Sequence, residues 1–156
     1  MEIILRPSEI SDLENLFTFQ LDHEANYLAA FTSKDPSDKP AYFQKYTKLF
    51  NDPAINNQTI IVNNIIAGSI AKFEIEGEAE ITYWIDKKFW GRGIATKALR
   101  YLLTIENARP IYGRVAFDNF GSQKVLEKCG FVKIGSDKGF ANARQEEIEE
   151  FIYKLG

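Results

Sequence analysis

Apolar and polar residues alternate along the chain with two different periods, and these periods predict where helices and strands form. Apolar residues recur with helical spacing in residues 13–21, 22–31, 40–50, 95–103 and 122–129. Runs typical of strands occupy residues 2–6, 58–62, 65–75, 79–86, 111–117 and 131–134. The segment 22–31 either continues the first helix or begins a second one.

Turn and cap residues indicate where some of these elements begin and end. Ser11 and Glu14 have the spacing of a capping box in front of the first helix. Asn63 and Asn64 separate two strand-like runs and predict a hairpin turn. Gly130 stands where a glycine commonly ends a helix, so the last predicted helix stops at about this residue.

The last ten-residue segment, 146–155, fits both periods. Ile148, Phe151, Ile152 and Leu155 have helical spacing, and the glutamates among them favour a helix. Alternation of apolar and polar residues fits a strand almost as well. The local pattern therefore favours a helix, with a strand as the alternative.

The order of elements predicts an α/β (α+β) domain built on a single mixed sheet. One strand and two or three helices come first, a group of antiparallel strands follows, and strands and helices then alternate. No linker or internal repeat divides the 156 residues. We therefore expect a single domain that spans residues 1–156.

Composition and charge exclude several classes of function. The chain is 45% hydrophobic and 26% charged, as in ordinary globular proteins, and its net charge of −3 argues against a nucleic-acid partner. No apolar run has the roughly 18–20 residues of a membrane span, and no secretory signal is visible, so we expect no membrane partner and a cytoplasmic location. Cys129 is the one cysteine and His23 the one histidine, so we expect no intrachain disulfide, no metal site and no hydrolase chemistry.

The stretch FWGRGIATKAL, residues 89–99, places two glycines around Arg92 between a predicted strand and a predicted helix. The first turn of a helix carries unpaired N–H groups and partial positive charge, and glycine lets an anion approach them. The spacing matches neither the Walker A motif nor the dinucleotide fingerprint, because Thr96 stands where each needs a glycine. By itself the stretch is as much a structural turn as an anion site.

Two segments together give a family resemblance. With DKKFWGRGIATKAL (residues 86–99) and NFGSQKVLEKCGF (residues 119–131), the chain resembles the GNAT superfamily of acyl-CoA-dependent N-acyltransferases, and within it the ribosomal-protein N-acetyltransferase branch. The resemblance implies a mostly antiparallel sheet of about seven strands flanked by about four helices. It implies a V-shaped splay between the strand that ends at Asp86 and the strand 111–117. It also implies that residues 146–155 form a strand, and we therefore expect a strand there in place of the locally favoured helix.

The resemblance implies acetyl-CoA as the acyl donor and no metal. In this family, backbone amides of the glycine loop bind the pyrophosphate of CoA, and pantetheine lies along the splayed strand. The implied contacts fall on Trp84, Ile85, Arg92, Gly93, Ile94, Ala95, Thr96, Lys97, Asn119 and Ser122. Trp90 departs from the general pattern, which has Arg or Gln there, although tryptophan is common at this position in the branch that the chain resembles.

Acyl transfer to an amine requires a proton acceptor and benefits from donors to the thioester oxygen and the leaving thiol. Glu80 is the candidate base, although it also reads as one of several glutamates on a solvated hairpin. The N–H of Ile85 is the candidate oxyanion donor. Many family members have a tyrosine acid at the position of Leu126. Here either Ser122 is the candidate acid, or no acid is required because a thiol with a pKa of about 8.5 can leave as the thiolate.

These residues predict an N-acetyltransferase that moves an acetyl group from acetyl-CoA to a primary amine by direct attack in a ternary complex. The acceptor is a protein N-terminus or a small molecule, and the enzyme is a monomer or a homodimer. One alternative is a non-catalytic acyl-CoA-binding or regulatory module of the same fold. Another is a nucleotide-binding module that uses the glycine loop.

Overall fold

A computed structural model describes residues 1–156, and its strands form one seven-stranded sheet in the order β1-β2-β3-β4-β5-β7-β6. The strands are Ile3–Pro7 (β1), Asn56–Val62 (β2), Ile65–Ile75 (β3), Glu78–Ile85 (β4), Ile111–Ala116 (β5), Val132–Ala141 (β6) and Glu146–Leu155 (β7). Only β4 and β5 pair in parallel, and every other neighbouring pair is antiparallel. The predicted mixed, mostly antiparallel sheet is confirmed.

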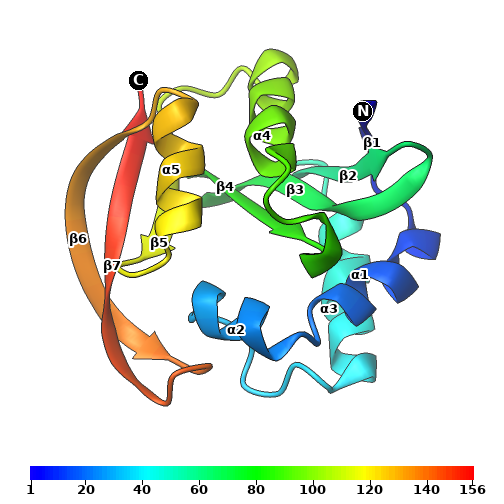
Figure 1. The fold of residues 1–156 in the computed structure, drawn as a ribbon, viewed down its shortest axis with the longest axis horizontal. Helices are drawn as coiled ribbons and strands as arrows, with labels where there is room; N and C mark the ends of the chain where they lie inside the picture. Colours follow the sequence, from blue (N-terminus) through cyan, green and yellow to red (C-terminus); the bar gives the residue numbers. More distant parts are fainter.

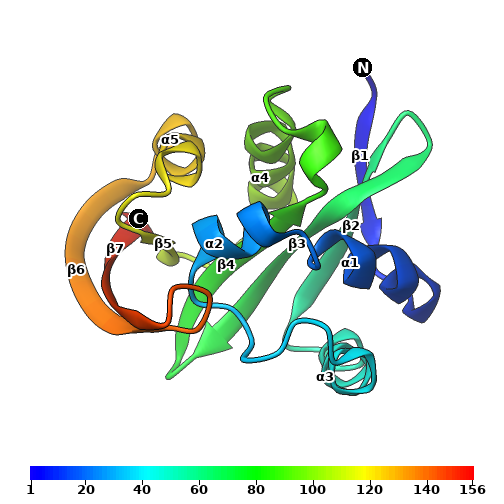
Figure 2. The same cartoon turned by 60° about the horizontal axis from the view of Figure 1, so that its bottom comes forward.

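Helices cover both faces of the sheet. They are Leu13–Phe19 (α1), His23–Ala29 (α2), Lys39–Phe50 (α3), Ile94–Ile105 (α4) and Phe120–Lys128 (α5), with short 3-10 turns at Ile10–Asp12 (η1) and Lys87–Phe89 (η2). Figures 1 and 2 show α4 and α5 on one side of the sheet and α1, α2 and α3 on the other. There is one α-helix more than expected, because Asp22 caps a new helix by accepting the Ala25 N–H at 2.8 Å.

The main hydrophobic core lies between the sheet and helix α4. It contains 18 buried residues, and α4 contributes the fully buried Leu99 and Leu102 together with Ile94. Ile81 and Ile85 of β4 belong to the same cluster. Burying each such side chain stabilises the fold by about 1.5–3 kcal/mol, so β4 is held firmly from this face.

The sheet opens between β4 and β5. The two strands pair only where Ala79–Ile81 faces Ile111–Gly113, although β4 continues to Ile85 and β5 to Ala116. On its other edge β4 stays paired to β3 along its whole length. The predicted V-shaped splay is therefore confirmed, with its narrow end at Ile81 and Gly113.

The C-terminal segment 146–155 is a strand, so the local preference for a helix was wrong and the implication of the family resemblance was right. β7 lies between β5 and β6 and pairs with both. Ile148 and Tyr153 are buried, whereas Glu146, Glu147 and Glu149 are exposed. Hydrogen bonding on both edges outweighs the helix propensity of the glutamates.

Two turn predictions are confirmed. Asn63 and Asn64 both have positive φ, 48° and 69°, and join β2 to β3. Gly130 follows α5 with φ of 91°, a backbone conformation that favours glycine.

The predicted capping box of Ser11 and Glu14 is wrong. The helical region begins earlier, with η1, and it is Asp12 whose carboxylate accepts the Glu9 N–H at 2.8 Å. The Ser11 hydroxyl reaches only the Glu9 carboxylate, at 3.5 Å. The real cap was missed because Asp12 serves a tertiary contact at the same time.

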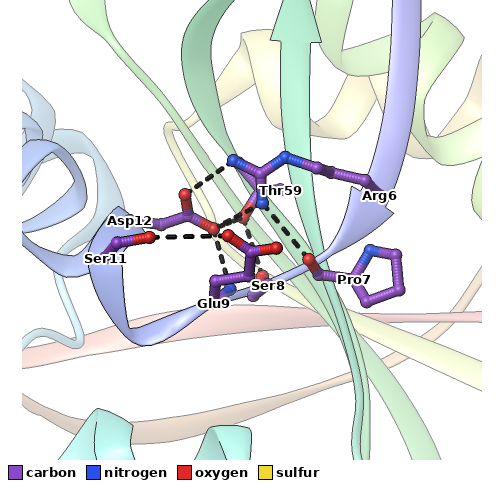
Figure 3. Close-up of polar contacts among 7 residues, drawn as sticks. All are labelled: Arg6, Pro7, Ser8, Glu9, Ser11, Asp12 and Thr59. Carbon is purple, nitrogen blue, oxygen red and sulfur yellow. Dashed lines mark hydrogen bonds and ion pairs between the residues drawn. The ribbon is translucent and has the colours of Figure 1, made fainter.

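Asp12 is a buried carboxylate that ties β1, η1 and β2 together (Figure 3). It accepts two hydrogen bonds from the Arg6 guanidinium, at 2.7 and 2.8 Å, and one from Thr59 Oγ1 at 2.8 Å. Burial opposes the charged form, but these bonds and the Glu9 N–H outweigh it and lower the pKa of Asp12. The cluster is structural and lies apart from the splay.

Candidate active site

The loop before α4 presents a row of free backbone donors. The N–H groups of residues 92–96 make no hydrogen bond within the protein. The Lys97 N–H, by contrast, already donates to Gly93 O at 3.1 Å, so Lys97 has only its exposed side chain to offer. Unpaired N–H groups and the positive end of a helix dipole suit an anion such as pyrophosphate.

Glycine is required in this loop by backbone conformation. Gly91 and Gly93 have φ of 77° and 74°, and a Cβ built at either would have no atom within 4 Å. No protein atom therefore competes for the space beside these residues. A phosphate group can approach the amides closely, and the residues present fit the pyrophosphate of CoA.

Trp90 anchors the loop to the end of β4. Its indole N–H donates to Ile85 O at 3.0 Å, and the neighbouring Phe89 is buried in the core. The guanidinium of Arg92 lies 5.6 Å from the centre of the Phe89 ring. The tryptophan that departs from the family pattern thus holds the loop against the strand.

β4 offers a free backbone edge inside the splay. The Asp86 N–H donates to Ala67 O of the β3 side at 2.8 Å. Because backbone groups alternate along a strand, those of Tyr83 and Ile85 face β5, where β4 has no partner strand. The Ile85 carbonyl accepts the Trp90 indole N–H, so the free groups of this edge are the two N–H groups and the Tyr83 carbonyl. An extended chain with amide groups, such as pantetheine, can pair with this edge.

Trp84 differs from its neighbours. The same alternation turns its backbone groups toward Ser69 of β3, and its indole N–H donates to Phe19 O at 3.3 Å. Its side chain lines the cleft described below. Any contribution of Trp84 to ligand binding therefore comes from its side chain.

The opposite wall of the splay carries Asn119 and Ser122 at the start of α5. Asn119 caps the helix, because its Oδ1 accepts the Ser122 N–H at 3.3 Å, and its Nδ2 is left without a protein partner. Ser122 Oγ accepts a hydrogen bond from the Tyr83 hydroxyl at 2.7 Å. Burial raises the pKa of Tyr83 to about 12. Sequence reasoning did not predict this contact, since nothing in the local pattern links the two residues.

Leu126, at the position of the family's usual tyrosine, is a packing residue. It is buried, and its side chain lies so close to Gly113 of β5 that a Cβ built there would be 2.8 Å from Leu126 Cδ2. The only polar side chain that α5 itself presents to the cleft near this point is that of Ser122.

Glu80 stands apart from the other glutamates of its hairpin. It is 6% exposed, whereas Glu74, Glu76 and Glu78 are exposed, so the solvated-hairpin interpretation is wrong for Glu80. Burial raises its pKa, and Arg114, whose Nε lies 3.6 Å from Glu80 Oε2, lowers it only in part. A carboxylate with a raised pKa is suited to accept a proton near neutral pH.

These residues line one cleft of about 900 Å³. It contains Glu80, Tyr83, Trp84, Asn119, Ser122 and Leu126. By alternation along β4, Glu80 and Tyr83 project from opposite faces of the strand, so Glu80 and Ser122 approach the narrow end of the splay from different sides. No direct contact joins the two candidate catalytic residues.

The far side of the cleft, under α3, is aromatic and acidic. Tyr42, Tyr46 and Trp84 supply rings, and burial raises the pKa of both tyrosines. Five carboxylates line the cleft against only two cationic side chains. The carboxylates are Asp35, Asp38, Glu74, Glu80 and Glu150, and the cations are Lys45 and Arg114. Negative charge therefore predominates in the cleft as a whole, which favours a cationic ligand.

Two other residues singled out in the sequence take no part in the cleft. Cys129 is half-buried, its Sγ lies 3.6 Å from Thr96 O, and burial raises the pKa of its thiol. His23 lies at the start of α2 and does not line the cleft. No group of three His, Cys, Asp or Glu side chains is arranged to hold a metal ion, and none of the helices is long and apolar enough to cross a membrane.

A parallel strand pair that splays, a free strand edge and an amide-rich helix start define an acyl-CoA-binding transferase fold. The chain belongs to the GNAT family of acetyltransferases, because the family model described as "Acetyltransferase (GNAT) domain" matches residues 2–132. The prediction from the two sequence segments is confirmed.

Relatives with assigned names support the same class. The chain is 26% identical to the uncharacterized N-acetyltransferase p20 of Bacillus licheniformis over 98% of this chain and 92% of that protein. It is 26% identical to the spermidine N(1)-acetyltransferase of Vibrio cholerae over 95% of this chain and 90% of that protein. A crystal structure of a Vibrio cholerae spermidine N-acetyltransferase with CoA and spermine has a TM-score of 0.79, with 23% identity over 97% of this chain and 95% of that chain. A crystal structure of the ribosomal L7/L12 alpha-N-protein acetyltransferase RimL has a TM-score of 0.81, with 22% identity over 98% of this chain and 89% of that chain.

Membership in this family makes the protein an acetyl-CoA-dependent N-acetyltransferase, with acetyl-CoA as the acyl donor. The named relatives differ in acceptor, from a polyamine to a ribosomal protein. The acceptor of this chain must therefore be argued from its own cleft.

Proposed function

We propose that the protein transfers the acetyl group of acetyl-CoA directly to a primary amine of a cationic acceptor, within a ternary complex. The observation that carries this proposal is Glu80, a buried carboxylate at the narrow end of a cleft that is lined by more carboxylates than cations. Polyamines and protein N-termini with basic residues nearby both have the required charge. A cytoplasmic location and a monomeric or homodimeric state stay predictions from the sequence.

The donor is held by the backbone. The N–H groups of residues 92–96 bind the pyrophosphate, and the free edge of Tyr83 and Ile85 pairs with the pantetheine amides. Asn119 Nδ2 donates to a carbonyl of the same arm. Acetyl-CoA supplies an activated thioester, which lies at the narrow end of the splay. The free β4 N–H nearest that end is that of Tyr83, so Tyr83 takes the place of the expected Ile85 as donor to the thioester oxygen, and the Ile85 N–H pairs with the pantetheine arm.

Glu80 accepts the proton that the acceptor amine must lose. An alkyl ammonium has an ordinary pKa near 10.4, so it needs a base and an environment that favours the neutral amine. The pKa of Glu80 is raised by burial, which brings the base closer to the working pH. Ser122 faces the leaving thiol from the other wall.

An acceptor screen tests the proposal. CoA release from acetyl-CoA would be followed with a thiol reagent in the presence of spermidine, spermine, basic and acidic N-terminal peptides, and neutral monoamines of similar length. We expect release with the polycationic or basic acceptors and little with the acidic peptides. Equal rates with acidic and basic acceptors would contradict the cationic assignment.

Thermal unfolding with CoA or ATP, measured beside this screen, separates the alternatives. A non-catalytic module would be stabilised by CoA in thermal unfolding yet release no CoA with any amine. A nucleotide-binding module would be stabilised by ATP as strongly as by CoA. Family membership and the buried Glu80 favour the catalytic interpretation.

A further inference from the structure

Two hydroxyl groups meet near the narrow end of the splay. Tyr83 lies two positions beyond Ile81, the last β4 residue that pairs with β5. Its hydroxyl donates to Ser122 Oγ on α5 at 2.7 Å, and both side chains line the cleft. The hydrogen bond therefore joins the two walls of the splay.

We propose that Tyr83 is a positioning residue that directs the Ser122 hydroxyl proton toward the leaving thiol of CoA. This inference rests on the proposed function, in which the thioester lies at the narrow end. Since the Tyr83 O–H occupies one lone pair of Ser122 Oγ, the serine proton must point elsewhere. Hydrogen bonds in a chain polarise one another, so the tyrosine also strengthens the bond that Ser122 donates to sulfur.

The fold determines which end of the donor reaches this pair. The phosphate-binding loop follows the C-terminal end of β4, so a chain laid along the free edge runs back from Ile85 toward Ile81. Four residue steps of a strand span about 13 Å. The end remote from the pyrophosphate, which carries the thiol, therefore comes to the Tyr83–Ser122 hydrogen bond.

The Tyr83 and Ser122 hydroxyl groups are both uncharged at neutral pH. Burial raises the pKa of Tyr83 to about 12, so the phenol holds its proton at neutral pH. The other titratable group whose charge acts on Tyr83 is Cys129, and burial raises the pKa of that thiol too, while Arg100 lowers it to a smaller extent. Both groups are uncharged in the working range.

No proton leaves Tyr83 or Ser122 in this role. When the carbon–sulfur bond breaks, its electron pair stays on sulfur, and a thiolate whose conjugate acid has a pKa near 8.5 is too weak a base to deprotonate Tyr83. The hydroxyl pair stabilises the thiolate by hydrogen bonding, and solvent protonates it after release. Leu126, on the next turn of α5, offers no donor that could replace Ser122.

Titration of the CoA thiol bound to the protein tests this role without any acceptor. The ultraviolet absorbance of the thiolate would be followed against pH in the wild type, Tyr83→Phe, Ser122→Ala and the double variant. We expect the bound thiol to titrate below free CoA, and each single variant to raise its pKa by about one unit, the size of one hydrogen bond. The double variant should match Ser122→Ala, because Tyr83 acts through Ser122.

Tyr153→Phe is the matched control. Tyr153 is also buried and donates its hydroxyl to Glu127 at 3.1 Å, away from the cleft. Its loss should leave the titration of bound CoA unchanged. An unchanged titration in Tyr83→Phe, or equal effects of that change with and without Ser122, would overturn the inference.

The result is independent of the acceptor screen. If no amine is acetylated but the four titrations behave as expected, the proposed acceptor class fails and the positioning role stands. If amines are acetylated and Tyr83→Phe changes neither the titration nor kcat, the positioning role fails alone.

Discussion

At the scale of single residues, the chemistry of this protein depends on where each carboxylate is buried. Glu80 and Glu78 are two positions apart on the same strand and therefore share one face, yet only Glu80 is buried. The difference arises because Glu80 is covered by Arg114 and lies near Glu150 of β7, an environment that no local sequence pattern reveals. The sequence therefore identified Glu80 as a candidate without being able to separate it from its solvated neighbours.

Glu80→Gln should lower kcat about 100-fold, the size of a typical general-base contribution, because glutamine cannot accept a proton. The KM for acetyl-CoA should change little, since Glu80 projects from the face of β4 opposite to Tyr83. Steady-state kinetics of CoA release measures both constants. Glu78→Gln, on the exposed part of the same hairpin, is the control, and a similar loss in that variant would show that hairpin charge matters in general.

Arg114→Gln should move the acid limb of the pH–rate profile to higher pH. Below the pKa of Glu80 the carboxylate is protonated and cannot act as a base, so kcat/KM falls with falling pH. Burial raises the pKa of Glu80 and Arg114 partly offsets this effect, so the pKa of Glu80 should rise further when Arg114 is removed. An acid limb at the same pH in both proteins would mean that another group titrates.

Asp12→Asn should destabilise the fold by about 2 kcal/mol at pH 7, because a buried partner of Arg6 loses its charge. The pKa of Asp12 is lower in the folded than in the unfolded chain, so its contribution is complete above the unfolded pKa and is lost as pH falls through the folded pKa. Urea unfolding at several pH values should show the gap to wild type closing only in acid. Glu147→Gln, an exposed carboxylate without an ion pair, should show no such gap.

At the scale of elements, an element could be predicted where neighbouring residues in the sequence specify it. The start of α4 is such a case, because the glycines with positive φ and the apolar stripe lie next to one another in the sequence. β7 was not, because its strand form depends on pairing with β5 and β6, which lie far from it along the chain. The capping pattern at Ser11 misled for the same reason, since Asp12 is fixed by Arg6 and Thr59.

Gly93→Asp should abolish CoA binding, since it adds a negative charge and a Cβ beside the free amides. Gly77→Asp is a close control: Gly77 has φ of 81°, its added Cβ would also meet no atom within 4 Å, and it lies in the β3–β4 turn. Both changes should cost about 1 kcal/mol of stability through the left-handed backbone. Calorimetric titration with CoA should separate them, and full affinity in a folded Gly93→Asp variant would contradict the phosphate-binding assignment.

At the scale of the whole molecule, α2 links the two sides of the splay. At one end Glu24 pairs with Lys87, just beyond β4, at 2.8 Å. At the other end Arg144, in the β6–β7 turn, donates to Tyr27 O at 2.6 Å and forms a two-bond ion pair with Asp118, at 2.8 and 2.9 Å. Figure 2 shows α2 in front of β4, and residues of α2 line the cleft. The acceptor side is thus enclosed by contacts between segments distant in sequence, which explains why the residues did not predict its shape.

Arg144→Ala should loosen α2 and weaken acceptor binding more than donor binding. The side chain is 4% exposed and also lies over the Tyr27 ring at 3.8 Å, so its removal breaks its links to Tyr27 and to Asp118 together. The backbone bond from the Ala143 N–H to Ala30 O, at the end of α2, remains. The donor site depends instead on the α4 loop and on Asn119, whose position is fixed by its own helix cap. We expect the acceptor KM to rise about tenfold, as for the loss of a charged hydrogen bond, and the CoA Kd to stay within about twofold.

Hydrogen exchange should accelerate in residues 23–29, whereas Lys138→Ala, an exposed position on the same hairpin, should leave it unchanged. Unaltered exchange in α2, or an equal loss of donor and acceptor affinity, would mean that the hairpin does not shape the acceptor side.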